Sequence, residues 1–219
     1  MIMNDFDFTD YIRNRVKEVK IWFVDIPRTG STSIKASLAS IHGRVFGKYG
    51  VRQGVKKGLI SDHTTALEMR DLLGEDIWED IFSFAFVRNP WDRMVSLYLY
   101  RTQIEQVTDM TFKDYVVQLC KHGPESHYLF DFHAFHYENW QYVCNDKGEQ
   151  IVDFVGKYEN RSEDLKTVSE CTNISYQYLI KHKYSVTDRT HYSEYYDDET
   201  RQLIAERYAR DIELFDYQF

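Results

Sequence analysis

The stretch KIWFVDIPRTGSTSIKASLASI, Lys20–Ile41, decides the fold of this chain. Its first part, Lys20–Ile26, is short, apolar and rich in β-forming residues, and it stops at Pro27. After the turn RTG, the apolar residues of STSIKASLASI recur at helical spacing. The stretch therefore predicts a strand, a tight loop and a helix.

Two further stretches repeat this order along the chain. The apolar run Ile81–Val87 is followed by Asn89, a natural N-cap, and by Pro90 at the first helical position. The run Ile151–Tyr158 precedes a helical stretch over 162–171. Strands that alternate with helices indicate an α/β fold with a mostly parallel central sheet covered by helices on both sides.

Composition predicts a soluble globular domain. The 219 residues are 43% hydrophobic and 28% charged, and no apolar run approaches the roughly 20 residues that span a bilayer. The net charge of -8 argues against duplex nucleic acid as a partner. The three cysteines, Cys120, Cys144 and Cys171, form no CxxC pair. We therefore expect one domain over 1–219 in a reducing cytoplasm, without a membrane or nucleic-acid partner.

The loop between the first strand and its helix carries anion-binding chemistry. Arg28, Thr29, Gly30, Ser31, Thr32 and Ser33 stand where the helix begins, so free backbone N–H groups, hydroxyls and a guanidinium gather at one point. The ATPase pattern GxxxxGK(S/T) is absent, because a serine occupies the lysine position. The loop predicts a phosphate site, and the alternative is a helix start capped by Ser31 or Thr32.

The second strand leads into FAFVRNPWDRMVS. Arg88 ends the strand and Ser96 follows eight residues later, a little over two helical turns, so both can converge on one anion. Arg93 has a different interpretation, as an exposed partner of Asp92 or as a structural brace.

Together the two motifs resemble those of sulfotransferases that use 3'-phosphoadenosine 5'-phosphosulfate (PAPS), in particular the group of heparan sulfate 2-O-sulfotransferase and its bacterial relatives. The loop PKTGxTS of that family is similar to Pro27–Ser33, and its motif FVRNPxxRxxS is similar to Phe86–Ser96. The resemblance implies a three-layer, P-loop-like nucleotide-binding topology. It also implies that the loop Arg28–Ser33 binds the 5'-phosphosulfate and that Arg88 and Ser96 bind the 3'-phosphate.

The resemblance continues through VDFVGKYEN, HYSEYYDDET and RDIELFDYQF, so it covers the chain from about Lys20 onward. It implies that Arg189, in SVTDRTHY, lies on a late basic loop over the 3'-phosphate. One departure concerns the loop lysine of the family, which is Arg28 here. Arginine is a wide, permanently charged fork, whereas lysine is a compact point donor.

A sulfuryl transfer also needs a base for the acceptor hydroxyl, and histidine is the commonest one near neutral pH. Among eight histidines, His63 in DHTTALEMRDLLG resembles the histidine that carries the base in the family. The alternative is that His63 caps its helix or packs beside Asp62.

These observations predict in-line sulfuryl transfer from PAPS to a hydroxyl of a carbohydrate-like acceptor, a small molecule or an oligosaccharide, with PAP as product and no metal. His63 and Arg28 are the predicted catalytic residues. The alternatives are a kinase-like phosphotransferase that uses ATP and an inactive module that binds PAP. The basic, Gly-rich segment 42–58 is either a solvated loop or a flap over an anionic ligand.

Overall fold

A computed structural model describes residues 5–42, 61, 63–104, 109–122, 137–179 and 189–219. Apart from His42, the segment 42–58 lies outside these residues. Contacts divide the chain into two compact units. Unit 1 comprises Met1–Ile26, Gly30–Val87 and Gln141–Tyr184, and unit 2 comprises Pro27–Thr29, Arg88–Trp140 and Ser185–Phe219. That the chain works as one domain stays a prediction.

Unit 1 contains a small sheet of three parallel strands in the order β1-β2-β3. The strands are β1 (Ile21–Val24), β2 (Phe82–Val87) and β3 (Phe154–Lys157). The first two pair with Ile21 opposite Phe82, and the last two with Phe84 opposite Phe154. Each strand lies within a stretch that the sequence predicts as a strand, so the parallel sheet is confirmed.

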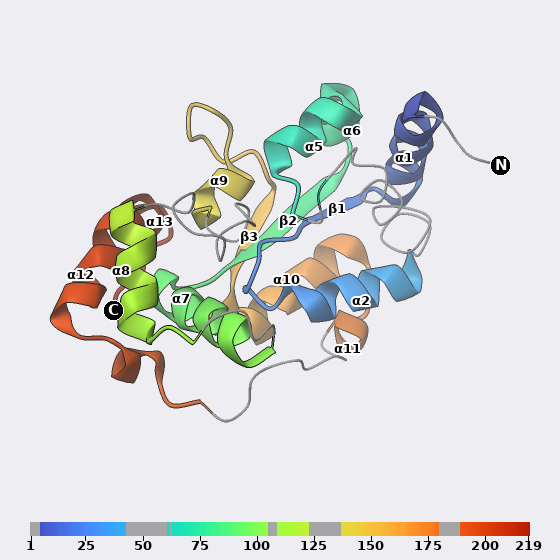
Figure 1. Cartoon of the computed structure of the whole chain (residues 1–219). Coiled ribbons are helices and arrows are strands. Elements are labelled where there is room, and N and C mark those ends of the chain that lie inside the picture. Colours follow the sequence, from blue (N-terminus) through green and yellow to red (C-terminus); the bar gives the residue numbers. More distant parts are fainter. Residues whose placement is uncertain (1–4, 43–60, 62, 105–108, 123–136, 180–188) are drawn as a thin grey trace. The chain divides into compact units, whose positions relative to one another are not determined.

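Helices flank both faces of this sheet (Figure 1). On one side lie α2 (Ser31–Ile41), α10 (Arg161–Thr172) and α11 (Tyr176–Leu179); on the other lie α5 (Ala66–Leu73) and α6 (Glu75–Glu79), against which α1 (Asp5–Val19) packs. Phe23, Phe84 and Phe86 are buried in one cluster with Leu38 of α2 and Leu165 of α10. This cluster holds α2 at a fixed place on the sheet.

Local sequence signals explain where these helices begin and end. Thr65 and Glu68 form a reciprocal capping box at the start of α5, and Gly74 with φ of 86° ends it. A short 3₁₀ turn, η5 (Tyr158–Asn160), joins β3 directly to α10. The sequence pattern over 64–73, closed by Gly74, predicts a helix, and α5 confirms it. The helix α10 begins at the carboxyl end of β3.

Unit 2 is helical. It contains α7 (Pro90–Leu99), continued by the π-helical turn η1 (Tyr100–Ile104), then α8 (Phe112–His122), the 3₁₀ turn η6 (Tyr192–Tyr195), α12 (Asp198–Arg207) and α13 (Ala209–Leu214). The short helix α9 (Asn139–Val143) spans the point where the chain passes from unit 2 to unit 1. Asn89 caps α7, since its side chain accepts the N–H groups of Trp91 and Asp92.

The core of unit 2 lies between α7, α8 and α12, with Trp91, Tyr115 and Ile204 among its buried residues. The sequence predicts one helix over 199–215, and this is wrong. The backbone leaves the helical region at Tyr208 (φ -108°, ψ 27°), whose ring is buried in the core, so α12 and α13 are separate.

The ring of Phe219 anchors the end of the chain. It packs edge-on against Trp91, Tyr192 and Tyr196. In the described part of the chain, no helix combines the length and apolar character needed to cross a bilayer.

Candidate functional site

The start of α2 carries no side-chain cap. Its N-cap is Gly30 with φ of 80°, whereas α5, α7 and α12 each begin with a side chain that accepts backbone N–H groups. The alternative of a helix capped by Ser31 or Thr32 is therefore wrong. The hydroxyls of Ser31 and Ser33 lie on buried residues, and Thr32 is exposed. First-turn N–H groups without a capping side chain, together with the positive end of the helix dipole, favour an anion here.

Arg161, the first residue of α10, contacts the same turn. Its Nη1 donates to the carbonyl of Gly30 at 2.7 Å, and its Nη2 donates to Ser33 Oγ. No motif in the sequence marks Arg161 as a site residue. The signal lies in the topology, because the carboxyl ends of neighbouring parallel strands share one edge of the sheet, where α/β proteins bind ligands.

Three residues that the sequence assigns to the donor site meet in unit 2. Nε and Nη2 of Arg28 donate to Ser96 Oγ at 3.3 and 3.2 Å, and the guanidinium lies over the Tyr100 ring at 4.4 Å from its centroid. Nη1 of Arg88 donates to the carbonyl of Arg28 at 2.9 Å. Arg28 itself has φ of 66°, a region that costs a non-glycine residue energy and is common at functional sites.

Asp92 links Arg88 to Arg189. Nε and Nη2 of Arg88 donate to its Oδ2 at 2.9 and 2.8 Å, and Nη2 of Arg189 donates to its Oδ1. The chain thus brings Arg189 to the carboxylate that Arg88 contacts. Nη1 of Arg189 is buried and has no hydrogen-bond partner among the described residues. Both arginines contact this one carboxylate.

Arg93 is a brace. Its side chain is buried, Nε donates to the carbonyl of Pro27 at 3.0 Å, and Nη1 donates to the carbonyl of Tyr137 at 2.7 Å. This confirms the interpretation as a structural brace and corrects the one as an exposed partner of Asp92. By fixing the carbonyl of Pro27, Arg93 holds the backbone directly before Arg28.

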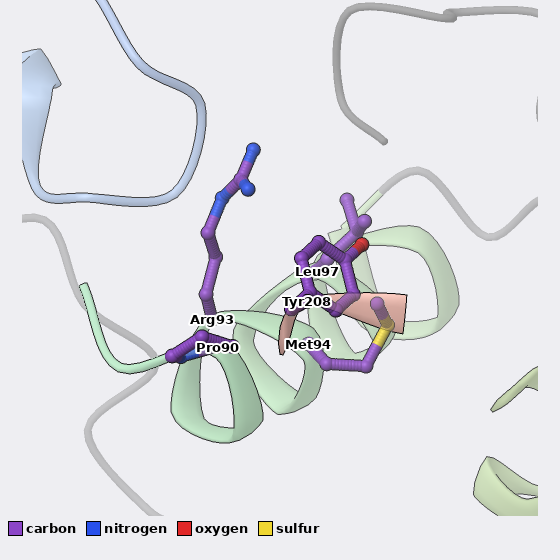
Figure 2. A pocket seen from close by; sticks show the side chains of 5 residues that line it. All are labelled: Pro90, Arg93, Met94, Leu97 and Tyr208. Carbon is purple, nitrogen blue, oxygen red and sulfur yellow. The ribbon is translucent and has the colours of Figure 1, made fainter. Parts of the chain in front are cut away.

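A hollow beside α7 is lined by Pro90, Arg93, Met94, Leu97 and Tyr208 (Figure 2). Figure 2 shows the guanidinium of Arg93 directed away from the Tyr208 ring. The hollow has no interior space that would hold even a water molecule, whereas small-molecule sites are sizeable clefts or cavities. It is therefore not a candidate for the donor nucleotide.

Asp211 holds the backbone of Asn139 and Trp140, and Asn139 in turn contacts the carbonyl of Arg88. Its carboxylate accepts the N–H groups of Asn139 and Trp140 at 2.7 and 2.8 Å, and Nδ2 of Asn139 donates to the carbonyl of Arg88 at 3.1 Å. Burial raises the pKa of Asp211 to about 6, although both backbone hydrogen bonds oppose the shift.

His63 lies in unit 1 beside Asp25, the residue after β1. Its Nδ1 is 2.9 Å from the Asp25 carbonyl and 3.4 Å from Asp25 Oδ2, and Lys35 forms an ion pair with the same Oδ2. A carbonyl only accepts, so Nδ1 carries the proton and the neutral ring has its lone pair on Nε2. Thr65 caps α5, so the alternative of a capping His63 is wrong, and Asp62 lies outside the described residues.

The structure thus groups the predicted residues in two sets, each described within its own unit. Arg28, Arg88, Ser96 and Arg189 gather in unit 2, whereas Gly30, Ser31, Thr32 and Ser33 form the start of α2 in unit 1. Thr29, between them in sequence, is buried. In the described ranges no three His, Cys, Asp or Glu side chains cluster as metal ligands would.

Comparison with known proteins identifies the family of the chain. An uncharacterised protein of Archaeoglobus fulgidus is 29% identical over 100 residues, which is 46% of this chain and 74% of that protein. No solved structure matches the chain. The sequence model of the sulfotransferase family matches residues 11–218, nearly the whole chain. The chain belongs to the sulfotransferase family.

Proposed function

We propose that this sulfotransferase moves a sulfuryl group from PAPS to a hydroxyl of a carbohydrate-like acceptor. The observation that carries the proposal is the cluster of Arg28, Arg88 and Arg189 in unit 2, in which Asp92 is shared by two guanidinium groups. Such a cluster suits an anion with several negative charges, because guanidinium forks pair with phosphate oxygens.

Features of the described residues fit an anionic donor. Arg189 Nη1 is a buried donor without a partner among them, and the start of α2 has no capping side chain. We assign the 5'-phosphosulfate to the loop Arg28–Ser33 and the 3'-phosphate to Arg88, Ser96 and Arg189. The P-loop-like topology that the sequence predicts belongs to this proposal. When bound, PAPS supplies an activated sulfuryl group on a phosphate that leaves as PAP.

The residues of the chain then have distinct tasks. Arg28 and the first-turn N–H groups of α2 stabilise negative charge on the leaving phosphate. His63 holds its Nδ1 proton on the Asp25 carbonyl, which directs the lone pair of Nε2 to the acceptor hydroxyl as a general base. The arginines supply the positive charge in this scheme, so we propose transfer without a metal.

The proposal extends to the setting of the enzyme. We propose one catalytic domain over 1–219 that works in the cytoplasm on a small-molecule or oligosaccharide acceptor, without nucleic-acid or membrane partners. The net charge of -8 and the polar composition support this setting.

Selective binding of a 3'-phosphate tests the proposal. Thermal unfolding with PAP, ATP and ADP at equal concentrations should show a rise in Tm with PAP and little change with the other two, because a ligand that binds the native state stabilises it more when its affinity is higher. A larger shift with ATP would favour the kinase-like alternative. Binding of PAP without any transfer from PAPS to an acceptor panel would favour the inactive module.

A further inference from the structure

We propose that Arg161 is a further donor-binding residue, whose guanidinium contacts the 5'-phosphosulfate end of PAPS. This inference rests on the proposed function and names a residue outside both sequence motifs. All the contacts that carry it lie within unit 1.

The position of Arg161 follows from the topology. The 3₁₀ turn η5 leads from β3 straight into α10, so Arg161 stands at the carboxyl edge of the sheet, as does the loop after β1. Its guanidinium lies so close to Gly30 that a Cβ added there would collide with Nη1. The absence of a side chain at Gly30 thus makes room for the guanidinium at the start of α2.

The charge of Arg161 has no carboxylate to balance it among the described residues. Its contacts within this part of the chain are with uncharged groups: the Gly30 carbonyl, the Ser33 hydroxyl and the Phe86 ring, whose centroid is 5.8 Å away, and it also interacts with Tyr158. Burial lowers the pKa of Arg161, but a guanidinium stays protonated in proteins. The N-terminus of α2 adds partial positive charge at the same place. Two neighbouring positive groups without an acid favour a bound anion.

The contacts of Arg161 also prepare Ser33 for a ligand. The Ser33 hydroxyl donates to the Gly30 carbonyl at 3.3 Å, a longer hydrogen bond than the one at 2.7 Å that Arg161 Nη1 donates to the same carbonyl. Arg161 donates to the Ser33 oxygen as well, so the single hydroxyl proton of Ser33 can turn to an anion. Arg161 thus places a guanidinium at the first turn of α2.

Isothermal titration of the full chain with three nucleotides tests this assignment. PAP carries both phosphates, 5'-AMP only the 5'-phosphate and 3'-AMP only the 3'-phosphate. The variants are Arg161→Gln, Arg161→Lys and the matched control Lys166→Gln, which removes an exposed cation of the same helix that pairs with Glu163. Circular dichroism and the Tm of each variant report whether it is folded.

Arg161→Gln should weaken PAP and 5'-AMP by roughly 10- to 100-fold, the usual range for a lost charged hydrogen bond, and leave 3'-AMP nearly unchanged. Lys166→Gln should bind like the parent. If Arg161→Gln does not fold, Arg161→Lys carries the test, since it keeps the charge but loses the fork and should weaken 5'-AMP more than 3'-AMP. Equal losses for 5'-AMP and 3'-AMP, or no loss, would overturn the assignment while PAP binding by the parent upholds the proposed function. A parent that binds none of the three overturns both.

Discussion

The guanidinium of Arg88 contacts the carboxylate of Asp92 through two nitrogens, Nε at 2.9 Å and Nη2 at 2.8 Å, and both side chains are buried. The remaining nitrogen, Nη1, donates to the carbonyl of Arg28. Asp92 therefore fixes the plane of Arg88 and also orients Arg189, 97 residues further along the chain. The Asp92 carboxylate, four residues after Arg88, thus orients the guanidinium groups of Arg88 and Arg189 in unit 2.

Loss of Arg88 should remove binding of PAP. Arg88→Gln alone leaves the buried charge of Asp92 with one partner fewer, and breaking a buried pair costs about 3 to 5 kcal/mol of stability. The double variant Arg88→Gln/Asp92→Asn removes both charges. We expect its affinity for PAP to fall roughly 100-fold or more by calorimetry, because contacts to the 3'-phosphate are lost.

The matched control for this variant is Arg201→Gln, which removes another guanidinium of unit 2 that stacks on Phe219. It should bind PAP like the parent. A folded double variant that keeps the parent's affinity would contradict the role given to Arg88.

Substitution of His63 should separate binding from turnover. His63→Ala removes the ring that holds its proton on the Asp25 carbonyl but no group assigned to the phosphates. We expect PAP affinity within about twofold of the parent and a kcat lower by roughly 10² to 10⁴, the usual contribution of a general base. His122→Ala, at the end of α8, is the control. Parent-like turnover by His63→Ala would refute the base assignment.

Gly30→Ala should disable the loop. Gly30 has φ of 80°, and an added Cβ would meet Arg161 Nη1 and the Tyr158 ring. Gly148→Ala is a matched control, because Gly148 also has positive φ (78°) but lies in a turn outside the site. Both variants should lose roughly 1 kcal/mol of stability from backbone strain, measured by urea unfolding. Only Gly30→Ala should also bind PAP more weakly than the parent. Equal PAP affinities of Gly30→Ala and Gly148→Ala would contradict the role given to Gly30 in the loop.

The free energy of unfolding should depend on pH through Asp211. Its pKa is about 6 in the folded state, above the ordinary aspartate value of 3.8, because of burial. Between pH 3.8 and about pH 6 the folded state therefore binds a proton on Asp211 that the unfolded state releases. Protonation of Asp211 thus raises the free energy of unfolding as pH falls through about 6, and this gain is lost as pH rises through about 6. From pH 7 to pH 5, the stability of the parent relative to Asp211→Asn should increase by roughly 1 kcal/mol.

Urea unfolding of both proteins at several pH values checks the sign. Asp197 and Glu199 have pKa values lowered first by their contacts to Lys113 and Lys121, so they act in the opposite direction, but they are present in both proteins and cancel in the difference. A difference that is constant with pH would show that Asp211 does not titrate in this range.

The sequence predicts the sheet and its helices well because their signals are local. Apolar runs that end at Pro27 and before Asn89 mark two of the strands, and Thr65 with Gly74 marks α5. The sequence predicts one helix over 199–215 because nothing in the local pattern marks the break at Tyr208. At that residue the helix is interrupted where the Tyr208 ring is buried in the core.

The site is predictable only where a motif names it. Arg28, Arg88 and Ser96 lie within the two motifs, and the structure brings them together. No motif predicts that Arg161 lies beside Gly30 or that Asp25 lies beside His63. These contacts depend on which strand ends share an edge of the sheet. Asp92 could be found from the sequence, since it lies in the first turn of the helix predicted from Pro90 and only four residues after Arg88.

Transfer of labelled sulfate is the most direct test of the proposed sulfuryl transfer from PAPS to a hydroxyl. The full chain is incubated with PAPS labelled in its sulfuryl group and a panel of hydroxyl-bearing saccharides, and both labelled product and released PAP are measured, with His63→Ala and the Arg88→Gln/Asp92→Asn variant in parallel. The parent should give labelled saccharide and PAP in equal amounts, and the variants should give little of either. PAP bound by the parent with no label transferred to any hydroxyl acceptor, or equal transfer by the variants, would contradict it.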